Sequence, residues 1–222
     1  SLVNQFPLKK GDILNHVSYE KGKGALRDLA AELGFFGAKF REHAIRVDLK
    51  PYDASIRLYL ESGSRARFGR VTFNETPLSD ELLQRFVTFK PGDPYRASQM
   101  LALQRSLLNS GYFATADVDA QPEKAKQGET PVAVNLGMAP RNRYEAGAGF
   151  GTDTGPRLSL GYRNRFVNSY GHTFQASARL SLIWNEVDAV YGIPLADPAK
   201  DQLAFTAKSG LEDTVAGRWP GC

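Results

Sequence analysis

Four closely spaced glycines are the first candidates for chemistry in this chain: Gly147, Gly149, Gly151 and Gly155. Clustered glycines can let a backbone approach a nucleotide phosphate, but the dinucleotide fingerprint needs a third glycine three residues after the second. Thr152 and Thr154 occupy those places, and no helical pattern follows. Because that fingerprint also requires a strand-to-helix context, the spacing argues against a nucleotide site.

No other set of residues has the spacing of a catalytic or metal centre. His16, His43 and His172 are far apart, and no ligand-spaced carboxylate or cysteine joins them. The single cysteine is the last residue, so it forms no internal disulfide. The net charge is only +4 and no Lys/Arg run is present, which argues against a nucleic-acid partner. We therefore expect no enzyme activity, no metal and no cofactor.

The stretch from Tyr144 to Asp153 has the alternation of a membrane-barrel strand. Side chains alternate across a strand with a period of two. One parity carries Tyr144, Ala146, Ala148 and Phe150, and the other carries glycine and acid. One apolar face opposite a nearly bare polar face suits the first strand of a barrel that has lipid outside and a polar lumen.

The same alternation continues towards the C-terminus. Four more segments show it, at 157–163, 173–182, 186–193 and 202–208, separated by turn signals at 153–156, 168–171 and 197–200. We expect five strands joined as a meander over residues 138–214, with an off-pattern tail at 215–222. Single-chain bacterial barrels have an even number of strands and at least eight, so we also expect the chain to be truncated at its C-terminus.

The first 137 residues contain an internal repeat. Phe6-Pro7-Leu8-Lys9-Lys10-Gly11-Asp12 matches Phe89-Lys90-Pro91-Gly92-Asp93, and the two glycines are 92 − 11 = 81 residues apart. An amphipathic helix is predicted after each match. The apolar stripes are Leu26, Leu29, Ala30 and Leu33 in the first copy and Met100, Leu103, Leu107 and Leu108 in the second. A glycine followed by aromatics, Gly34 and then Gly111, is expected to close each helix in the left-handed conformation.

Extended segments complete each copy. They are predicted at 45–49 and 56–60 in the first copy, and at 116–120 and 132–136 in the second. The second copy adds a strand at 68–73 and a short helix at 79–86 with Ser79 as its N-cap. The repeating unit is thus strand, helix, helix, strand, strand. The first copy lacks its first strand, so we expect an N-terminal truncation and a less stable first unit.

These elements in this order resemble the POTRA-plus-barrel proteins of the BamA/TamA family, and within it the TamA branch, the outer-membrane subunit of the translocation and assembly module. The motifs that carry the resemblance span nearly the whole chain. They are Gly11–His16 with Tyr19-Glu20, Phe68–Phe73, Gly92–Tyr95, Ser110–Phe113, Gly149–Arg157 and Asn168–His172. The resemblance implies an α+β fold: POTRA domains at 1–63 (incomplete) and 64–137, followed by the first strands of an antiparallel transmembrane β-barrel.

Two features depart from the family pattern. Gly22 and Gly24 fall at a helix start, where each glycine costs up to about 1 kcal/mol relative to alanine if it is helical. The arginine-glycine-aromatic loop motif of a late strand pair and the last barrel strand are not in the chain. These residues alone are therefore not expected to form the family's complete gate.

The resemblance implies a function without a catalytic step. It implies insertion of β-rich client proteins into the bacterial outer membrane, with the POTRA domains in the periplasm and a TamB-like, inner-membrane-anchored partner. Two alternatives stay open: a secretion pore for a dedicated cargo, and a POTRA-barrel anchor for an upstream enzyme domain.

Three groups of site residues follow as hypotheses. The first barrel strand would pair with client strands through Tyr144, Ala146, Gly147, Ala148, Gly149, Phe150 and Gly151. The second strands of the POTRA units, around Ala38, Phe40 and Phe113, would accept partner or client strands, or would be ordinary edges. Arg141, Arg143, Arg163 and Arg165 would gather at the periplasmic rim and bind lipid headgroups, or would be solvated rim charges.

Overall fold

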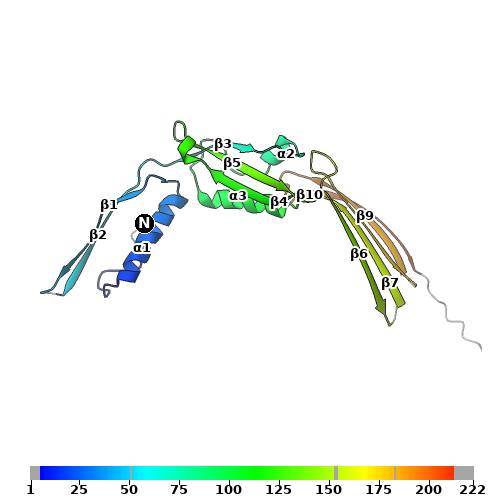
Figure 1. Ribbon diagram of the computed structural model, residues 1–222, viewed down its shortest axis with the longest axis horizontal. Coiled ribbons are helices and arrows are strands. Elements are labelled where there is room, and N and C mark those ends of the chain that lie inside the picture. Colours follow the sequence, from blue (N-terminus) through cyan, green and yellow to red (C-terminus); the bar gives the residue numbers. More distant parts are fainter. Residues whose placement is uncertain (1–5, 51, 153–154, 183, 213–222) are drawn as a thin grey trace, which may run out of the picture. The chain divides into compact units, whose positions relative to one another are not determined.

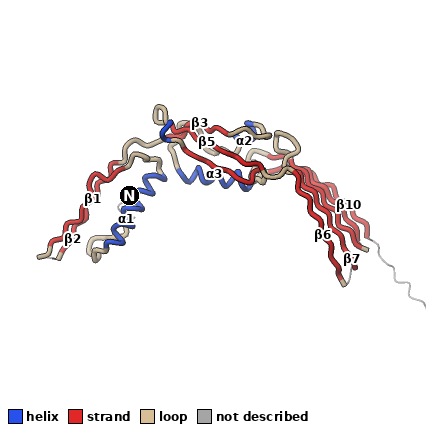
Figure 2. Tube along the Cα trace, in the orientation of Figure 1, coloured by secondary structure: helices blue, strands red, loops and turns tan. Residues whose placement is uncertain are grey.

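The computed structural model describes residues 6–50, 52–152, 155–182 and 184–212. Figures 1 and 2 trace the elements along the chain. By packing, the chain divides into two compact units: Ser1–Thr72, Thr88–Ala102 and Val118–Val134 form one, and Phe73–Val87, Leu103–Asp117 and Asn135–Cys222 form the other. The predicted boundaries at 63/64 and 137/138 follow the sequence repeat instead. The predicted tail at 215–222 and part of the turn at 153–156 lie outside the described residues.

The first repeat contributes one helix and one hairpin. Helix α1 (His16–Glu32) begins at Asn15, whose side chain accepts hydrogen bonds from Val17 N and Ser18 N. Gly34 follows it with φ +81°, the predicted left-handed closure. Strands β1 (Lys39–Asp48) and β2 (Asp53–Glu61) pair antiparallel as a sheet of their own. Both predicted strands are confirmed, and each is longer than the alternation indicated.

Gly22 and Gly24 lie within α1 and not at its start as predicted, because the helix already begins at His16. The two glycines have different surroundings. Gly22 is buried, and a Cβ there would lie closer than 3.0 Å to the Phe6 ring. Gly24 has nothing within 4 Å of its Cβ position. The first glycine therefore permits a close helix-to-ring approach, whereas the second only lowers helix propensity.

The second repeat has the predicted order of strand, helix, helix, strand, strand. Its elements are β3 (Arg67–Phe73), α2 (Asp80–Gln84), α3 (Ala97–Asn109), β4 (Phe113–Ala120) and β5 (Glu129–Met138), with a 3₁₀ turn η2 (Pro122–Lys124) between the last two strands. The sheet order β3-β5-β4 places β5 in the middle. Ser79 caps α2 by accepting a hydrogen bond from Leu82 N at 3.3 Å, as predicted.

Each compact unit has its own share of buried apolar side chains. In the first unit, the Phe68 ring stacks on the Phe89 ring with a centroid separation of 3.8 Å. Val132 and Val134 of β5 are fully buried in the same unit. In the second unit, the buried side chains include Leu82, Leu83, Phe86, Leu103, Leu107 and Leu136. Helix α3 buries Met100, Leu103 and Leu107, but Leu108 is 39% exposed. The expectation that Leu108 joins the stripe was wrong, because one further residue rotates the side chain about 100° around the helix.

The C-terminal part is one antiparallel sheet. Strands β6 (Asn142–Gly151), β7 (Gly155–Asn164), β8 (Thr173–Ser181), β9 (Trp184–Pro194) and β10 (Gln202–Glu212) pair in the order β10-β9-β8-β7-β6. This is the predicted five-strand meander, and Figure 1 shows the strands side by side. Among the described residues, β6 and β10 are hydrogen-bonded to a neighbouring strand on one side only. None of the helices in the described ranges has the length and apolar character needed to cross a membrane.

Candidate functional site

Strand β6 carries the predicted two-faced pattern into a sheet. Its register with β7 pairs Tyr144 with Tyr162 on the apolar face and Gly149 with Arg157 on the polar face. Because partners in an antiparallel ladder share a face, apolar residues meet apolar ones along the whole strand pair. The alternation predicted from the sequence is therefore confirmed in register.

The apolar face is not covered by any described part of the chain. Tyr144 is 75% exposed, Phe150 78% and Leu211 75%. Tyr144 and Tyr162 lie 5.2 Å apart between ring centroids, and Tyr162 also contacts Phe174. A continuous exposed apolar surface of this kind marks a membrane or protein interface.

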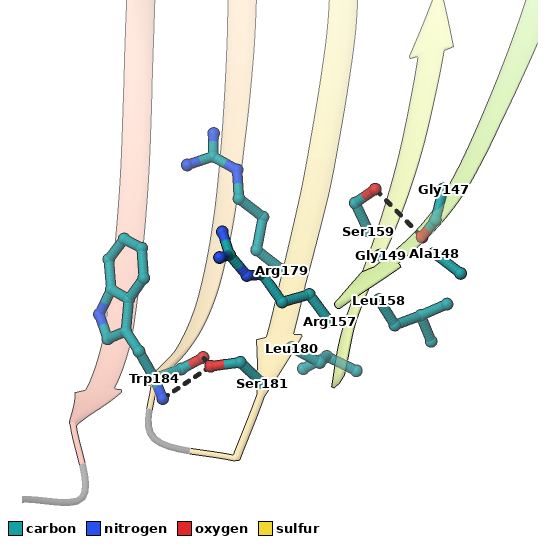
Figure 3. Close-up of a pocket in the computed structure, with 10 residues that line it drawn as sticks. All are labelled: Gly147, Ala148, Gly149, Arg157, Leu158, Ser159, Arg179, Leu180, Ser181 and Trp184. Atoms are coloured by element: carbon teal, nitrogen blue, oxygen red, sulfur yellow. Dashed lines mark hydrogen bonds between the residues drawn. The ribbon is translucent and has the colours of Figure 1, made fainter. Parts of the chain in front are cut away.

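Figure 3 shows the glycine-bearing end of β6 beside β7 and β8. Arg157 and Arg179 project to one side of the strands, while Leu158 and Leu180 lie on the other. A cleft of about 360 Å³ opens here. Ser159 Oγ donates a hydrogen bond to Gly147 O at 3.3 Å across the strand pair.

The β6 glycines leave much of this face bare. A Cβ at Gly147 would lie 2.7 Å from Ser159 Oγ, the end of a small side chain, and one at Gly149 would meet nothing within 4 Å. Gly149 is therefore not required by packing within the described sheet, whereas a side chain at Gly147 would displace the Ser159 hydroxyl. Both glycines also act on the strand itself, because glycine weakens a strand and eases its bending.

Charged residues on the polar face are held in ion pairs. Glu186 is almost fully buried, and its carboxylate lies 2.5 Å from Lys208 Nζ and 3.4 Å from Arg179 Nη1. Asp188 accepts a hydrogen bond from Ser177 Oγ at 2.6 Å. Two cations around one buried carboxylate connect β8, β9 and β10 across the polar side of the sheet.

The four predicted rim arginines lie on paired segments of the backbone. Arg143 pairs with Arg163, and Arg165 N donates to Arg141 O at 2.8 Å. Their alternation places them on the polar face, opposite the exposed apolar one. The lipid-headgroup role remains a prediction, and this placement gives it no support.

Two of these arginines also hold backbone carbonyls. Arg141 donates to Phe166 O and Val167 O at 3.1 and 2.8 Å. Arg165 Nη1 donates to Gly111 O at 2.9 Å. These side chains therefore have structural bonds that the sequence did not indicate.

The strands predicted to be POTRA edges lie at the edges of their sheets. The residues named on them differ in how accessible they are to a partner strand. Ala38 lies one residue before β1, and its N–H donates to Phe35 O at 3.1 Å, so it is outside the strand. The Phe40 ring lies under the Arg27 guanidinium at 5.3 Å. Phe113 is 4% exposed, so only its backbone faces an edge. In the described part of the chain, β1 pairs only with β2, and β4 only with β5.

One feature was missed by the sequence reasoning: the turn between β7 and β8 docks on the second repeat. Tyr112 Oη donates a buried hydrogen bond to Gly171 O at 2.6 Å, and Ser79 N donates to Ser169 O at 2.8 Å. A Cβ on Gly171 would lie under 3.0 Å from both Leu82 and Tyr112 Oη. The sequence indicated a turn around Gly171 and a helix end before Tyr112. No spacing in the sequence indicates that these two segments contact each other.

Comparison with known proteins supports the repeat and the sheet. Residues 66–136 match the POTRA family, described as a surface antigen variable number repeat. A relative from Treponema pallidum (strain Nichols), described as "Putative outer membrane protein assembly factor", is 28% identical over 116 residues, which are 52% of this chain and 14% of that protein.

Solved structures show the same fold across nearly the whole chain. BamA from Haemophilus ducreyi lacking POTRA domains 1–3 aligns with a TM-score of 0.77 at 15% identity, over 96% of this chain and 41% of that one. CdiB from Acinetobacter baumannii aligns with a TM-score of 0.55 at 14% identity, over 94% of this chain and 40% of that one. The chain thus spans about two-fifths of those solved chains and a smaller share of the sequence relative.

These comparisons agree with the expectation of a protein without enzyme activity, since the relatives are an assembly factor, BamA and CdiB. No group of three or more potential metal ligands occurs among the described residues. The predicted α+β fold is confirmed by the POTRA match and the BamA alignment. Residues 66–136 are therefore a POTRA repeat, and the chain has the fold of a BamA-like POTRA-barrel protein in which the described barrel strands form an open sheet.

Proposed function

We propose that this chain belongs to a factor that assembles β-rich proteins into the bacterial outer membrane. The observation that carries the proposal is the edge of β6, a glycine-rich strand that follows the POTRA repeat directly and has a described partner only in β7. The exposed apolar face of the same sheet fits the hydrocarbon region of a bilayer. The POTRA repeat then lies in the periplasm.

The proposed mechanism is strand addition. An unpaired strand edge presents a row of N–H and C=O groups, and an incoming extended segment gains main-chain hydrogen bonds by pairing with it. The low side-chain content of β6 on its polar face leaves room for this exchange, because Gly149 has no neighbour within 4 Å of its Cβ position. Residues 144 and 146–151 are the proposed client-contacting positions.

The finer assignment is to the TamA branch, with a TamB-like inner-membrane-anchored protein as periplasmic partner. The motif order of the sequence supports it, from Gly11–His16 to Asn168–His172. Strands β1 and β4 are the proposed partner-binding edges, near Phe40 and Phe113, with Ala38 at the entrance to β1.

Site-specific crosslinking along β6 tests the assembly function. A photoreactive residue at Tyr144, Ala146 or Ala148 of the full-length protein should capture β-barrel clients during their assembly in proteoliposomes. The matched control is Ala207 on β10, a small residue in a strand at the other end of the described sheet. Equal capture at both edges would contradict a special role for β6, and capture of one secreted cargo alone would support the secretion-pore alternative.

The same approach on the repeats tests the partner. Probes at Phe40 and at Thr115 on β4 should capture the TamB-like protein in intact cells. Probes on the exposed face of α3, at Arg105, provide the background. Capture no greater than at Arg105 would show that these are ordinary edges.

A further inference from the structure

A polar pocket of about 260 Å³ lies on the polar face of the sheet, next to the end of helix α3. It is lined by side chains from β8, the end of β7, β10 and the helix end, including Ser110, Arg163, Arg165, Thr173, Gln175 and Gln202. All of these residues belong to one compact unit. The lining contains two arginines and no carboxylate.

The two arginines differ from three other cations of this face. Arg179 and Lys208 are paired with Glu186, and Arg143 Nε lies 2.8 Å from Glu145. Within the described ranges, no carboxylate lies within ion-pair distance of Arg163 or Arg165. The pocket therefore concentrates two positive charges that the described chain leaves uncompensated.

Arg165 is already positioned. Its Nη1 donates to Gly111 O at 2.9 Å, which fixes the guanidinium at the helix end. Its Nε is buried and has no hydrogen-bond partner among the described residues. A buried donor without a partner costs free energy that a bound acceptor would recover. The Arg163 side chain, by contrast, is exposed and makes no hydrogen bond to a described residue.

We propose that this pocket binds a carboxylate of an extended polypeptide segment. Arginine donors match a carboxylate in geometry and charge. The surrounding amide and hydroxyl side chains of Gln175, Gln202 and Thr173 are suited to the peptide groups that flank such a carboxylate. A lipid phosphate would satisfy the arginines too, but the pocket opens on the face opposite the exposed apolar side chains.

One glycine beside the pocket lies close to two side chains of its lining. A Cβ at Gly192 of β9 would lie 2.5 Å from Thr173 Oγ1 and 3.2 Å from Gln202 Oε1, both in the pocket lining. Alanine at this position would force these two side chains to move without changing any charge. Gly210 of β10, also on the polar face of the sheet, has no atom closer than 3.5 Å to its Cβ position and provides the matched control.

This inference goes beyond the assembly role, because the pocket would hold its ligand whether or not β6 pairs with clients. The test is therefore an equilibrium binding measurement on the full-length protein in detergent, with no assembly step. The probe is a fluorescein-labelled ten-residue Ser/Glu peptide, compared with its Ser/Gln counterpart and with phosphatidylglycerol vesicles. Fluorescence anisotropy at low ionic strength gives the affinity for each peptide, and co-sedimentation gives vesicle binding.

We expect the Glu peptide to bind at least about tenfold tighter than the Gln peptide, the range of a charge-assisted hydrogen bond. Arg163→Gln and Gly192→Ala should each abolish most of that preference, whereas Gly210→Ala should keep it. The Arg163 side chain makes no hydrogen bond or ion pair with the described chain, so this variant is expected to fold. Equal binding of the two peptides, or an unchanged preference in Arg163→Gln, would overturn the proposal. Vesicle binding that depends on Arg163 without any peptide preference would overturn it in favour of a lipid ligand.

Discussion

The buried hydroxyl of Tyr112 joins the POTRA repeat to the turn between β7 and β8. Its Oη donates to Gly171 O at 2.6 Å, and burial raises the pKa of Tyr112 to about 12. The neutral phenol is therefore favoured in the folded state. A tyrosine with a raised folded-state pKa contributes stability that is fully present below the unfolded pKa near 10 and is lost as the pH rises through about 12.

Tyr112→Phe should weaken this junction in two measurable ways. At neutral pH, the variant leaves Gly171 O without its buried donor, which costs about 1–3 kcal/mol. Between pH 10 and 12, the wild-type protein should lose stability that the variant has already forfeited, so the two unfolding temperatures should converge. Thermal unfolding followed by circular dichroism in detergent measures both effects. A constant difference from pH 7 to 12 would show that the hydroxyl does not titrate with folding.

Helix α1 illustrates how one residue type has two structural roles in one element. Gly22 faces the Phe6 ring, whereas Gly24 has open space at its Cβ position. Helix propensity alone treats them equally, because each costs about 1 kcal/mol relative to alanine.

Alanine at these two positions should therefore act in opposite directions. Gly24→Ala should stabilise α1 by up to about 1 kcal/mol. Gly22→Ala should destabilise it, because displacing the Phe6 ring costs about 1–3 kcal/mol and outweighs the gain in propensity. Hydrogen exchange of the α1 amides in the full-length protein, read by mass spectrometry, gives both signs. Slower exchange in both variants would mean that the ring moves aside freely.

The two repeats also differ in how well their sheets are buried. Strands β1 and β2 form a two-stranded sheet without a buried residue, whereas the central strand β5 buries Val132, Val134 and Leu136. Isolated two-stranded sheets are marginal in water. The weakness predicted for the first repeat thus has a physical basis in the described residues.

Hydrogen exchange should show that difference directly. We expect the amides of β1 and β2 to exchange at least about a hundredfold faster than those of β5, a difference in opening free energy of about 3 kcal/mol. Peptides covering 39–61 and 129–138 of the same sample provide the comparison. Equal protection would mean that residues outside the described ranges, or a partner, cover the first sheet.

At the scale of the whole molecule, function depends on whether the edge of β6 can exchange partners. Gly149 has open space at its Cβ position and a side chain at Gly147 would meet the Ser159 hydroxyl, so replacing these glycines acts mainly on the mechanics of the strand. Val favours a stiff, flat strand where Gly permits bending.

Replacing Gly147, Gly149 and Gly151 with Val in the full-length protein should reduce client assembly by about tenfold or more at an unchanged protein level. The matched control is Gly210→Val on β10, because the Cβ position of Gly210 has only ordinary contacts, the nearest at 3.5 Å. Assembly of a model barrel client in proteoliposomes is the measurement. Unchanged assembly in the triple variant would contradict the gate role of β6, and equal loss in the control would assign the effect to general rigidity.

The sequence by itself determined the elements and the faces. The alternation of apolar and polar residues with a period of two predicted strands β6–β10 and their meander. The sequence repeat marked by Gly11 and Gly92 predicted a strand, helix, helix, strand, strand unit. These predictions succeeded because local periodicity and turn chemistry are properties of neighbouring residues. The exception at Leu108 of α3 shows the limit, because an apolar residue type does not by itself tell which face of the helix is packed.

Only the tertiary structure decided which distant residues meet. It brought Tyr112 to Gly171, paired Glu186 with both Arg179 and Lys208, and placed the Arg165 guanidinium against Gly111 O. Such contacts join residues from different elements, and no periodicity records them. A buried hydrogen bond or ion pair depends on positions in space that chain order leaves open, which is why the junction and the arginine pocket became visible only in the folded chain.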